Sequence, residues 1–441
     1  MDTERRPAVL LLGTDKYVMQ ACVRHGVDAV VIWGSTAYDY GIVPVPEQFT
    51  VLRVDDQSSA EAVLTALHRA GLADREYDAV LTSDEWAMVT AGLVAEHLGC
   101  RGIDPVTAAH FRDKSLQKRR IAAAGLRTAR VTVIDDVHDV SAVTELPYPR
   151  AVLKPIAGAA TARTSVVASL ADLEQRSRQY RKEKTAQRTF ALEEFVEGDE
   201  WVADGVVFEG EIVFHALGTY GDPCLTVVEQ GLPLRLRRFD PKSESWAYEL
   251  GDPFVRRAIE ALGLRNGAFH MELFHHPEHG LAFGECASRR GGALIHEELQ
   301  AKFNVHLGAA QLFAALGRRP ELNVVVRPET IGGTYLPGRP GTLISCPSPA
   351  ELRAQPGVEF ARVEFPFGGQ FADGLGSTNQ KLGQVLVAAD SEDELQARLA
   401  ELRAWFAERT VVAPYGGSIR ELRAWQRETW PEQDYRDALW D

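Results

Sequence analysis

Short apolar runs alternate with amphipathic stretches through about the first 105 residues, a pattern typical of strands alternating with helices. The predicted strands are Ala8–Leu12, Asp28–Trp33 and Tyr77–Thr82. The predicted helices are Tyr17–His25, Ala60–Arg69 and Trp86–Leu98, the last capped by Ser83 or Asp84. Because the strands are continuously apolar, they predict a parallel sheet covered on both faces, in an α/β domain over residues 1–110.

The next part of the chain changes to an α+β pattern, over residues 111–196. One helix is predicted from Asp113 to Leu126, with Leu116, Ala123 and Ala124 on a shared face. The predicted strands are Ala129–Ile134, Pro149–Pro155, Val166–Val167 and Arg188–Val196, with a charged helix at Leu170–Lys182. We therefore expect a linker helix followed by a small subdomain.

Antiparallel strands and then helices are predicted from Trp201 to Leu316, in a larger subdomain over residues 197–320. Within it, Glu209-Gly210 is a two-residue hairpin signal between two apolar strands. Residues 321–441 predict a further α+β subdomain. Its elements are strands near Gly332–Leu336, Ala361–Phe365 and Gln384–Ala389, and a long helix at Glu392–Arg409.

The composition is that of a soluble globular protein, with 45% hydrophobic and 25% charged residues. A length of 441 residues favours about three domains or subdomains. No apolar run reaches the ~20 residues that span a bilayer, and the N-terminus lacks the pattern of a signal peptide. The five cysteines form no CxxC pair, which favours a reducing cytoplasm over disulfides or structural zinc. The net charge of -14 argues against nucleic acid as a partner.

The strongest chemical signal is a pair of apolar strands that flank the turn Pro277–Gly280. A turn centred in the middle of these four residues places Glu272 opposite Glu285 and His270 opposite Ala287. Directly opposed residues have Cβ atoms ~5 Å apart. Two carboxylates that close repel each other unless a cation lies between them, and both are hard oxygen ligands that suit Mg2+. Two alternatives stay open: a different register would separate the carboxylates, or Lys or Arg would neutralise them.

A short basic loop follows the second carboxylate, with Arg289 and Arg290 before Gly291-Gly292. Arginine can hold a carboxylate or phosphate through two hydrogen bonds, and glycines let backbone N–H groups approach an anion closely. This loop is therefore a candidate anion site, and a solvated basic loop is the alternative.

Two earlier segments are candidates for nucleotide binding. Lys154 ends a predicted strand before a loop of small residues that includes Gly158, and such a loop can cover phosphates. Glu193, Val196 and Glu200 lie where a strand runs into an acidic turn between two predicted subdomains. Acidic residues there can accept hydrogen bonds from an adenine amino group and from ribose hydroxyls, and a solvated hinge is the alternative.

In this order, the segments resemble the ATP-grasp superfamily over nearly the whole chain. The resemblance implies an ATP-grasp fold of α/β and α+β class, with a Rossmann-like N-terminal domain, a small ATP-lid subdomain, a large antiparallel subdomain and a C-terminal α+β extension. It also implies that Lys114 and Lys154 contact ATP phosphates beneath the lid loop that contains Gly158.

The same family pattern implies roles for the remaining candidates. Glu193 would take the adenine amino group, Val196 would offer backbone contacts to the ring, and Glu200 would bind the ribose hydroxyls. The two metal carboxylates of the family fall on Glu272 and Glu285.

One departure from the family pattern is Ala287, which stands where a metal-binding Asn is usual. One metal would then lack a protein ligand, or be held by water or by a bidentate Glu285. The run Glu-Cys-Ala-Ser-Arg around Arg289 instead resembles the bacterial L-amino acid (dipeptide) ligases and the carnosine-synthase-like branch. In those proteins the matching Arg meets the substrate carboxylate or acyl-phosphate, and the His that matches His270 lines the same site.

The resemblance implies an ATP-dependent, ADP-forming ligase that joins an amino acid carboxylate to an amine through an acyl-phosphate. ATP and Mg2+, or Mn2+ in its place, are the expected cofactors, and residues 128–190 are expected to close over ATP. His270 is also a candidate general base. The protein is expected to be cytoplasmic, with small-molecule substrates, no nucleic acid or membrane partner, and a homodimer as the family's expectation. The alternatives are a γ-glutamyl or natural-product amide ligase, and a phosphotransferase or ATP-binding protein on the same fold.

Overall fold

The computed structural model describes residues 5–34, 45–365, 367–371, 377–378, 380–414 and 418–429. The chain divides into two compact units. The larger unit contains Met1–Pro223 and Arg238–Arg327, and the smaller contains Cys224–Arg237 and Pro328–Asp441. The four domains expected from the sequence stay a prediction, because this division separates two units only. None of the helices in the described residues is long and apolar enough to cross a membrane.

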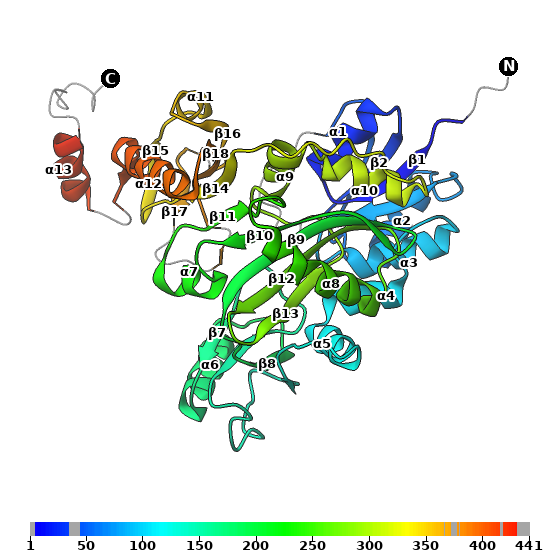
Figure 1. Cartoon of the computed structure of the whole chain (residues 1–441), viewed down its shortest axis with the longest axis horizontal. Coiled ribbons are helices and arrows are strands. Elements are labelled where there is room, and N and C mark those ends of the chain that lie inside the picture. Colours follow the sequence, from blue (N-terminus) through cyan, green and yellow to red (C-terminus); the bar gives the residue numbers. More distant parts are fainter. Residues whose placement is uncertain are drawn as a thin grey trace. The chain divides into compact units, whose positions relative to one another are not determined.

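The larger unit begins with a four-stranded parallel sheet in the order β3-β2-β1-β4 (Figure 1). Its strands are β1 (Ala8–Leu12), β2 (Asp28–Gly34), β3 (Thr50–Val54) and β4 (Ala79–Thr82), and its helices are α1 (Lys16–Arg24), α2 (Ala60–Arg69) and α3 (Met88–Leu98). Alternate residues of β1 enter different cores, Leu11 on one face of the sheet and Leu10 on the other. The predicted parallel sheet with two covered faces is confirmed, whereas β3 was not predicted.

The start of α3 differs from the prediction. The helix follows Ala87, which makes no side-chain capping hydrogen bond. The predicted cap is therefore wrong. Asp84 instead forms a turn directly after β4, where its Oδ1 accepts a hydrogen bond from the backbone N–H of Trp86 at 2.9 Å. A short carboxylate side chain readily captures a nearby N–H in this way, and here it does so before the helix begins.

Helices α4 (Pro105–Arg112) and α5 (Lys114–Ala123) lead out of this sheet. Asp113 caps α5, and the helix ends at Ala123, ahead of Gly125 with its φ of 71°. The predicted apolar face of α5 is wrong, because Leu116 is only half-buried and Ala123 is exposed. The buried residues are Lys114, Ser115, Gln117, Lys118 and Ile121. The helix therefore buries a mostly polar face.

A small antiparallel sheet follows, in the order β5-β8-β6-β7. Its elements are β5 (Val131–Ile134), β6 (Ala151–Pro155), β7 (Ser165–Val167), α6 (Leu170–Lys182) and β8 (Phe190–Glu194). Residues of α6 such as Leu173 and Tyr180 pack on this sheet in one core with Phe190. We call residues 128–196 the lid, and its predicted strands and helix are confirmed.

The central sheet of the larger unit runs in the order β13-β12-β9-β10, and its paired strands are antiparallel. The elements are β9 (Asp199–Phe208), β10 (Glu211–Tyr220), α8 (Ser245–Leu262), β12 (Gly267–His276), β13 (Gly280–Ala287), α9 (Ile295–Phe303) and α10 (Leu307–Ala315). Helix α8 covers one face of this sheet. Helix α10 packs against α1, and its Leu312 completes a core of the N-terminal sheet (Figure 1). The predicted hairpin turn is confirmed, because Glu209 and Gly210 join β9 to β10 with φ values of 53° and 88°.

The smaller unit has its own sheets and its own core. One run of antiparallel strands follows the order β11-β14-β18-β16, and a three-stranded sheet follows the order β17-β15-β19. The strands are β11 (Arg235–Arg238, which reaches the boundary between the units), β14 (Thr330–Leu336), β15 (Gly341–Ser345), β16 (Val358–Val363), β17 (Gln370–Phe371), β18 (Gly383–Ala389) and β19 (Val411–Ala413). The helices are α7 (Cys224–Gln230), α11 (Pro349–Arg353), α12 (Glu392–Arg409) and α13 (Ile419–Thr429). The strands and long helix predicted for this region are confirmed, with β16 placed slightly earlier than expected.

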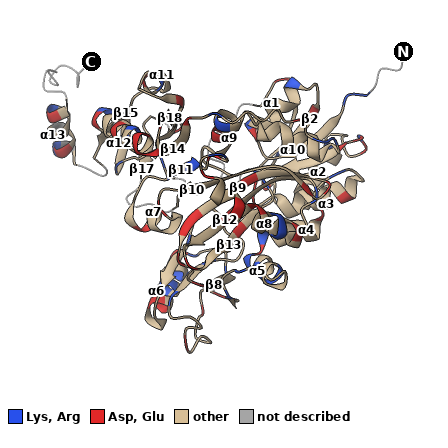
Figure 2. Ribbon diagram, in the orientation of Figure 1, with Lys and Arg blue, Asp and Glu red and all other residues tan. Residues whose placement is uncertain are grey.

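Charged residues are not confined to exposed helices. Figure 2 shows acidic and basic segments on helices such as α6, α12 and α13, but it also shows acidic segments within the central sheet. Asp204 on β9 is fully buried, and Glu200 on the same strand is 5% exposed. Because burying a charge is costly unless it is paired, these positions direct attention to the central sheet as the functional site.

Candidate active site

The hairpin β12–β13 brings the two predicted metal carboxylates together. Glu272 pairs with Glu285 and His270 pairs with Ala287, so the predicted register is confirmed at these positions. Nearer the turn, however, His276 pairs with Gly280, which is one residue out of that register, and a bulge next to Glu272 restores it. Gly284 occupies the bulge, where an added Cβ would lie only 2.9 Å from the carbonyl oxygen of Glu272.

Two lysines lie against Glu285. The Nζ atoms of Lys114 and Lys154 are 3.3 and 3.6 Å from its Oε2. Burial raises the pKa of Glu285, but the two lysines outweigh burial and bring that pKa to about 2. Glu272 instead contacts His270, whose Nε2 is 3.5 Å from its Oε1. The facing register and the neutralising lysines, which the sequence left as alternatives, therefore occur together.

Glu193 on β8 extends the same cluster of charges. Its Oε2 is 3.0 Å from Nζ of Lys154 and 3.3 Å from Nζ of Lys118. Burial lowers the pKa of Lys154, but Glu193 and Glu285 outweigh burial and raise it above its usual value. Burial brings the pKa of Lys118 down to about 8 against the attraction of Glu193. Lys118 was not among the site residues predicted from the sequence, although it lies one helical turn from Lys114 on α5.

The lid loop after β6 is docked on the start of α5. The backbone N–H of Lys114 donates to the carbonyl of Ile156 at 3.0 Å, and its Nζ donates to the carbonyl of Gly158 at 3.0 Å. Beyond Gly158, three residues that carry a Cβ have φ near 56°, namely Ala160, Thr161 and Arg163. Such backbone conformations are uncommon outside glycine and gather at ligand-binding loops. Gly158 thus lies beside a predicted phosphate lysine.

The three predicted nucleotide residues of the hinge lie along one connection. Glu193 is buried on β8, Val196 is half-buried in the link to β9, and Glu200 is buried one residue into β9. The hinge therefore leads from the lid sheet into the central sheet, as the sequence indicated. The contacts of these residues with adenine and ribose stay predictions.

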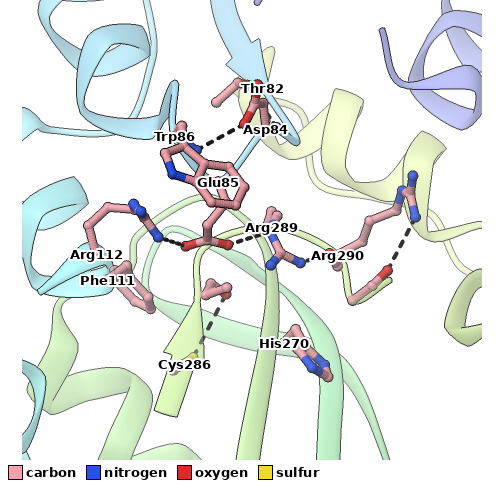
Figure 3. A network of polar contacts seen from close by, with 12 residues as sticks. Thr82, Asp84, Glu85, Trp86, Phe111, Arg112, His270, Cys286, Arg289 and Arg290 are labelled. Atoms are coloured by element: carbon pink, nitrogen blue, oxygen red, sulfur yellow. Dashed lines mark hydrogen bonds and ion pairs between the residues drawn. The ribbon is translucent and has the colours of Figure 1, made fainter. Parts of the chain in front are cut away.

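Arg289 is held by a carboxylate from the loop that follows β4 (Figure 3). Its Nε donates to Oε2 of Glu85 at 2.5 Å, and Nη1 of Arg112 donates to the other carboxylate oxygen at 2.6 Å. Burial raises the pKa of Glu85, but Arg289 and Arg112 outweigh burial and lower it. Glu85 therefore carries a charge shared between two guanidinium groups.

The neighbouring Arg290 makes an equivalent contact, since its Nε donates to Oδ2 of Asp15 at 2.9 Å. Asp15 and Glu85 each lie three residues beyond the ends of β1 and β4, which are adjacent parallel strands. Neither residue was predicted from the sequence to belong to the site. Ligands of open α/β sheets bind at the carboxyl ends of the strands, so acidic residues at two such ends were the signal that could have found them.

Behind His270 lies a chain of buried charges. Nδ1 of His270 is 2.8 Å from Asp204, which accepts from Arg238 at 2.9 Å, and Arg238 also donates to Glu298 at 2.9 Å. Burial lowers the pKa of His270, but Asp204 and then Glu272 outweigh burial and raise it to about 10. Gly291 packs against Asp204 and His270, because a Cβ added at Gly291 would lie 2.8 Å from both Asp204 Oδ1 and His270 Nδ1.

The residues present suit a magnesium nucleotide. Among the described residues, no group of three or more His, Cys, Asp or Glu is arranged to hold a metal ion by itself. Mg2+ in phosphate-handling sites commonly takes one or two carboxylates and completes its ligands with phosphate oxygens and water. The opposed Glu272 and Glu285 provide the carboxylates, and the buried lysines beside them provide charge for the phosphates. Ala287 provides no third ligand at its position.

Known proteins support the same fold. No family model matches the chain. The sequence is 25% identical over 329 residues to the L-arginine-specific L-amino acid ligase of Bacillus subtilis, covering 74% of this chain and 78% of that protein. The L-amino acid ligase of Bacillus licheniformis superposes with a TM-score of 0.73 at 19% identity, over 94% of this chain and all of that one. An ATP complex of carboxyaminoimidazole ribonucleotide synthase from Aspergillus clavatus superposes with a TM-score of 0.66 at 15% identity, over 91% of this chain and 99% of that one. The ATP-grasp fold and the resemblance to carboxylate–amine ligases, expected from the sequence, are confirmed.

Proposed function

We propose that this protein, an ATP-grasp enzyme by its fold and its relatives, is an ADP-forming ligase that joins two amino acids into a dipeptide. The observation that carries the proposal is the facing pair Glu272–Glu285 on β12 and β13, with Lys114 and Lys154 beside Glu285. Arg289 lies two residues beyond the end of β13, at the start of the loop that follows. Such a set suits a nucleotide, a divalent metal and a substrate carboxylate in one place.

The choice of amino acids as substrates is supported by two relatives. The Bacillus subtilis protein is named for L-arginine and for amino acid ligation, and the Bacillus licheniformis structure carries the name of an L-amino acid ligase. The run of residues from Glu285 to Arg289 also resembles that group.

In the first step, a carboxylate oxygen of the acid bonds to the γ-phosphorus of ATP while the bond to ADP breaks, which gives an acyl-phosphate. Arg289 would hold the acid, and its guanidinium is already oriented by Glu85 at 2.5 Å. Lys114 and Lys154 would offset the charge on the phosphates. Glu272 and Glu285 would hold Mg2+, which when bound supplies positive charge to the transferring phosphoryl group.

In the second step, the amine of the other substrate attacks the acyl carbon, phosphate leaves, and the amine loses a proton. We assign His270 to the binding of the acyl-phosphate and not to proton removal, because both of its ring nitrogens face carboxylates, Nδ1 at 2.8 Å from Asp204 and Nε2 at 3.5 Å from Glu272. A histidine that stays protonated near neutral pH donates hydrogen bonds and cannot accept the proton. The lid would exclude water, since an acyl-phosphate hydrolyses readily.

The test is the release of ADP and phosphate from ATP and Mg2+ with the twenty L-amino acids, supplied singly and in pairs, with mass spectrometry of the products. We expect release that requires a pair and a product whose mass equals the two amino acids minus water. Release with a stable phosphorylated product from one substrate would identify a phosphotransferase instead. A ligated product with an acid or amine outside the panel would move the proposal to another amide ligase.

A further inference from the structure

Strand β13, which carries Glu285, is the outer strand of the central sheet as that sheet is described. The outer edge of such a strand leaves backbone N–H and C=O groups without a neighbouring strand. In this protein, side chains of helix α5 cover that edge. The polar face of α5, which contradicted the predicted apolar face, is buried for this reason.

Gln117 acts like a strand partner for the residue after Glu285. Its Nε2 donates to the carbonyl of Cys286 at 2.7 Å, and its Oε1 accepts from the N–H of Cys286 at 3.0 Å. The same Nε2 also donates to the carbonyl of Phe111 at 2.7 Å, which ties the amide to the end of α4. Gln117 is 2% exposed, so both of its contacts with Cys286 are shielded from water.

Lys118 holds the residue before Glu285. Its Nζ donates to the carbonyl of Gly284 at 2.6 Å, at the bulge that brings Glu285 opposite Glu272. One residue further back, the N–H of Phe283 donates to the carbonyl of Arg127 at 2.8 Å. The backbone is therefore fixed on both sides of Glu285, from outside the sheet.

We propose that Gln117 and Lys118 are positioning residues, which act on the metal through Glu285 by fixing the backbone on either side of it. This inference rests on the proposed function, because it takes Glu285 as a metal carboxylate. Lys118 has a second contact, 3.3 Å from Glu193 on the predicted adenine side. It therefore also connects the nucleotide side of the site to the metal side, whereas the Gln117 amide contacts Cys286 and the end of α4.

The two residues consequently have different expected effects. Loss of the Gln117 amide releases both backbone groups of Cys286, so Glu285 should bind the metal less well while the nucleotide contacts stay intact. Loss of the Lys118 ammonium removes a partner of Glu193 as well, so binding of nucleotide without metal should also weaken. A residue that only stabilised the fold would not separate these two effects.

The test measures ATP binding to the full chain by calorimetry, first with a chelator and then with MgCl2. For Gln117→Met we expect metal-free ATP affinity within about twofold of wild type, and an enhancement of ATP affinity by Mg2+ that is reduced by about tenfold, the scale of one or two net hydrogen bonds. For Lys118→Met we expect weaker ATP binding under both conditions. Gln311→Met is the matched control, because Gln311 is a buried glutamine of α10 that donates to the carbonyl of Thr82 at 3.4 Å.

A Gln117→Met protein with the wild-type response to Mg2+ overturns the proposal. If that variant does not fold, Gln117→Glu decides, because it keeps an acceptor for the Cys286 N–H and loses the N–H groups that donate to the carbonyls of Cys286 and Phe111. A wild-type response to Mg2+ in Gln117→Glu would overturn the proposal in the same way. A wild-type protein whose ATP affinity does not respond to Mg2+ would instead refute the metal role of Glu285, and with it the proposed function.

Discussion

Replacing Glu285 with glutamine removes a charge that two lysines share and keeps the shape of the side chain. Lys114 and Lys154 lie 3.3 and 3.6 Å from this carboxylate, and both are mostly buried. Without the carboxylate, less negative charge remains nearby to offset the positive charge of these two ammonium groups. Glu285→Gln should therefore lower the stability of the protein and at the same time leave more positive charge available to a phosphate.

The magnitude follows from the pKa of Glu285. A fall from 4.5 to about 2 in the folded chain corresponds to ~3 kcal/mol. The side chain is 30% exposed, so solvent screening reduces this figure to ~2 kcal/mol. Because the folded pKa lies below the unfolded one, this stabilisation is complete above pH ~4.5 and is lost as the pH falls towards 2. In Glu285→Gln, the free energy of unfolding should not show this loss between pH ~4.5 and 2.

The assays are urea unfolding at neutral pH and ATP titration in the presence of a chelator. We expect Glu285→Gln to unfold with ~2 kcal/mol less free energy and to bind metal-free ATP about tenfold more tightly, the equivalent of ~1.4 kcal/mol. It should also lose turnover with Mg2+. Glu272→Gln is the matched control, because among the described residues Glu272 has its ion pair with His270 and none with the two lysines.

Three results would contradict this prediction. Weaker binding of metal-free ATP by Glu285→Gln would mean that the carboxylate itself favours binding of the phosphates. Loss of its charge would then not make the two lysines more available to the phosphates. Full turnover with Mg2+ would remove Glu285 from the metal site. If Glu272→Gln tightened metal-free ATP equally, the effect would reflect general charge and not the two lysine contacts.

Three further predictions concern the acid site and the metal. Arg289→Ala should reduce ADP release by ~100-fold while ATP affinity changes little, since we propose that Arg289 holds the acid. Single-turnover kinetics beside calorimetry checks this, and equal losses in both would give Arg289 a nucleotide role. Glu85→Gln weakens the contacts that orient Arg289 and Arg112, so it should raise the KM for the acid by about tenfold through loss of preorganisation. Steady-state kinetics measures this, and an unchanged KM would contradict the role of Glu85 in orienting Arg289. Chelation of divalent ions should stop ADP release and either Mg2+ or Mn2+ should restore it, whereas release that continued would point to metal-independent chemistry.

Much of the fold follows from local sequence patterns. The apolar strands of the N-terminal sheet, the helices Ala60–Arg69 and Leu170–Lys182 and the turn Glu209-Gly210 depend on periodicity and turn chemistry that short segments carry by themselves. The register of the two carboxylates was also predicted correctly. The match depends on the bulge at Gly284, which offsets a turn that begins one residue out of the expected register.

The site was harder to predict where it depends on contacts between distant segments. Glu85 and Asp15 are separated from Arg289 and Arg290 by more than 200 residues, and no local pattern joins them. The buried face of helix α5 was predicted wrongly for another reason. Helical periodicity predicts that apolar residues are buried, whereas this helix buries lysine and glutamine against charged and backbone groups. Such exceptions to the hydrophobic pattern are expected at functional sites.

The central claim is that the acid becomes an acyl-phosphate, and 18O transfer tests it most directly. The acid of the active pair is supplied with both carboxylate oxygens labelled, together with ATP, Mg2+ and the amine, and the products are analysed by mass spectrometry. We predict one labelled oxygen in the released phosphate and one in the amide, since the oxygen that bonds to phosphorus departs with it. Label in AMP, or phosphate without label beside a ligated product, would contradict this account.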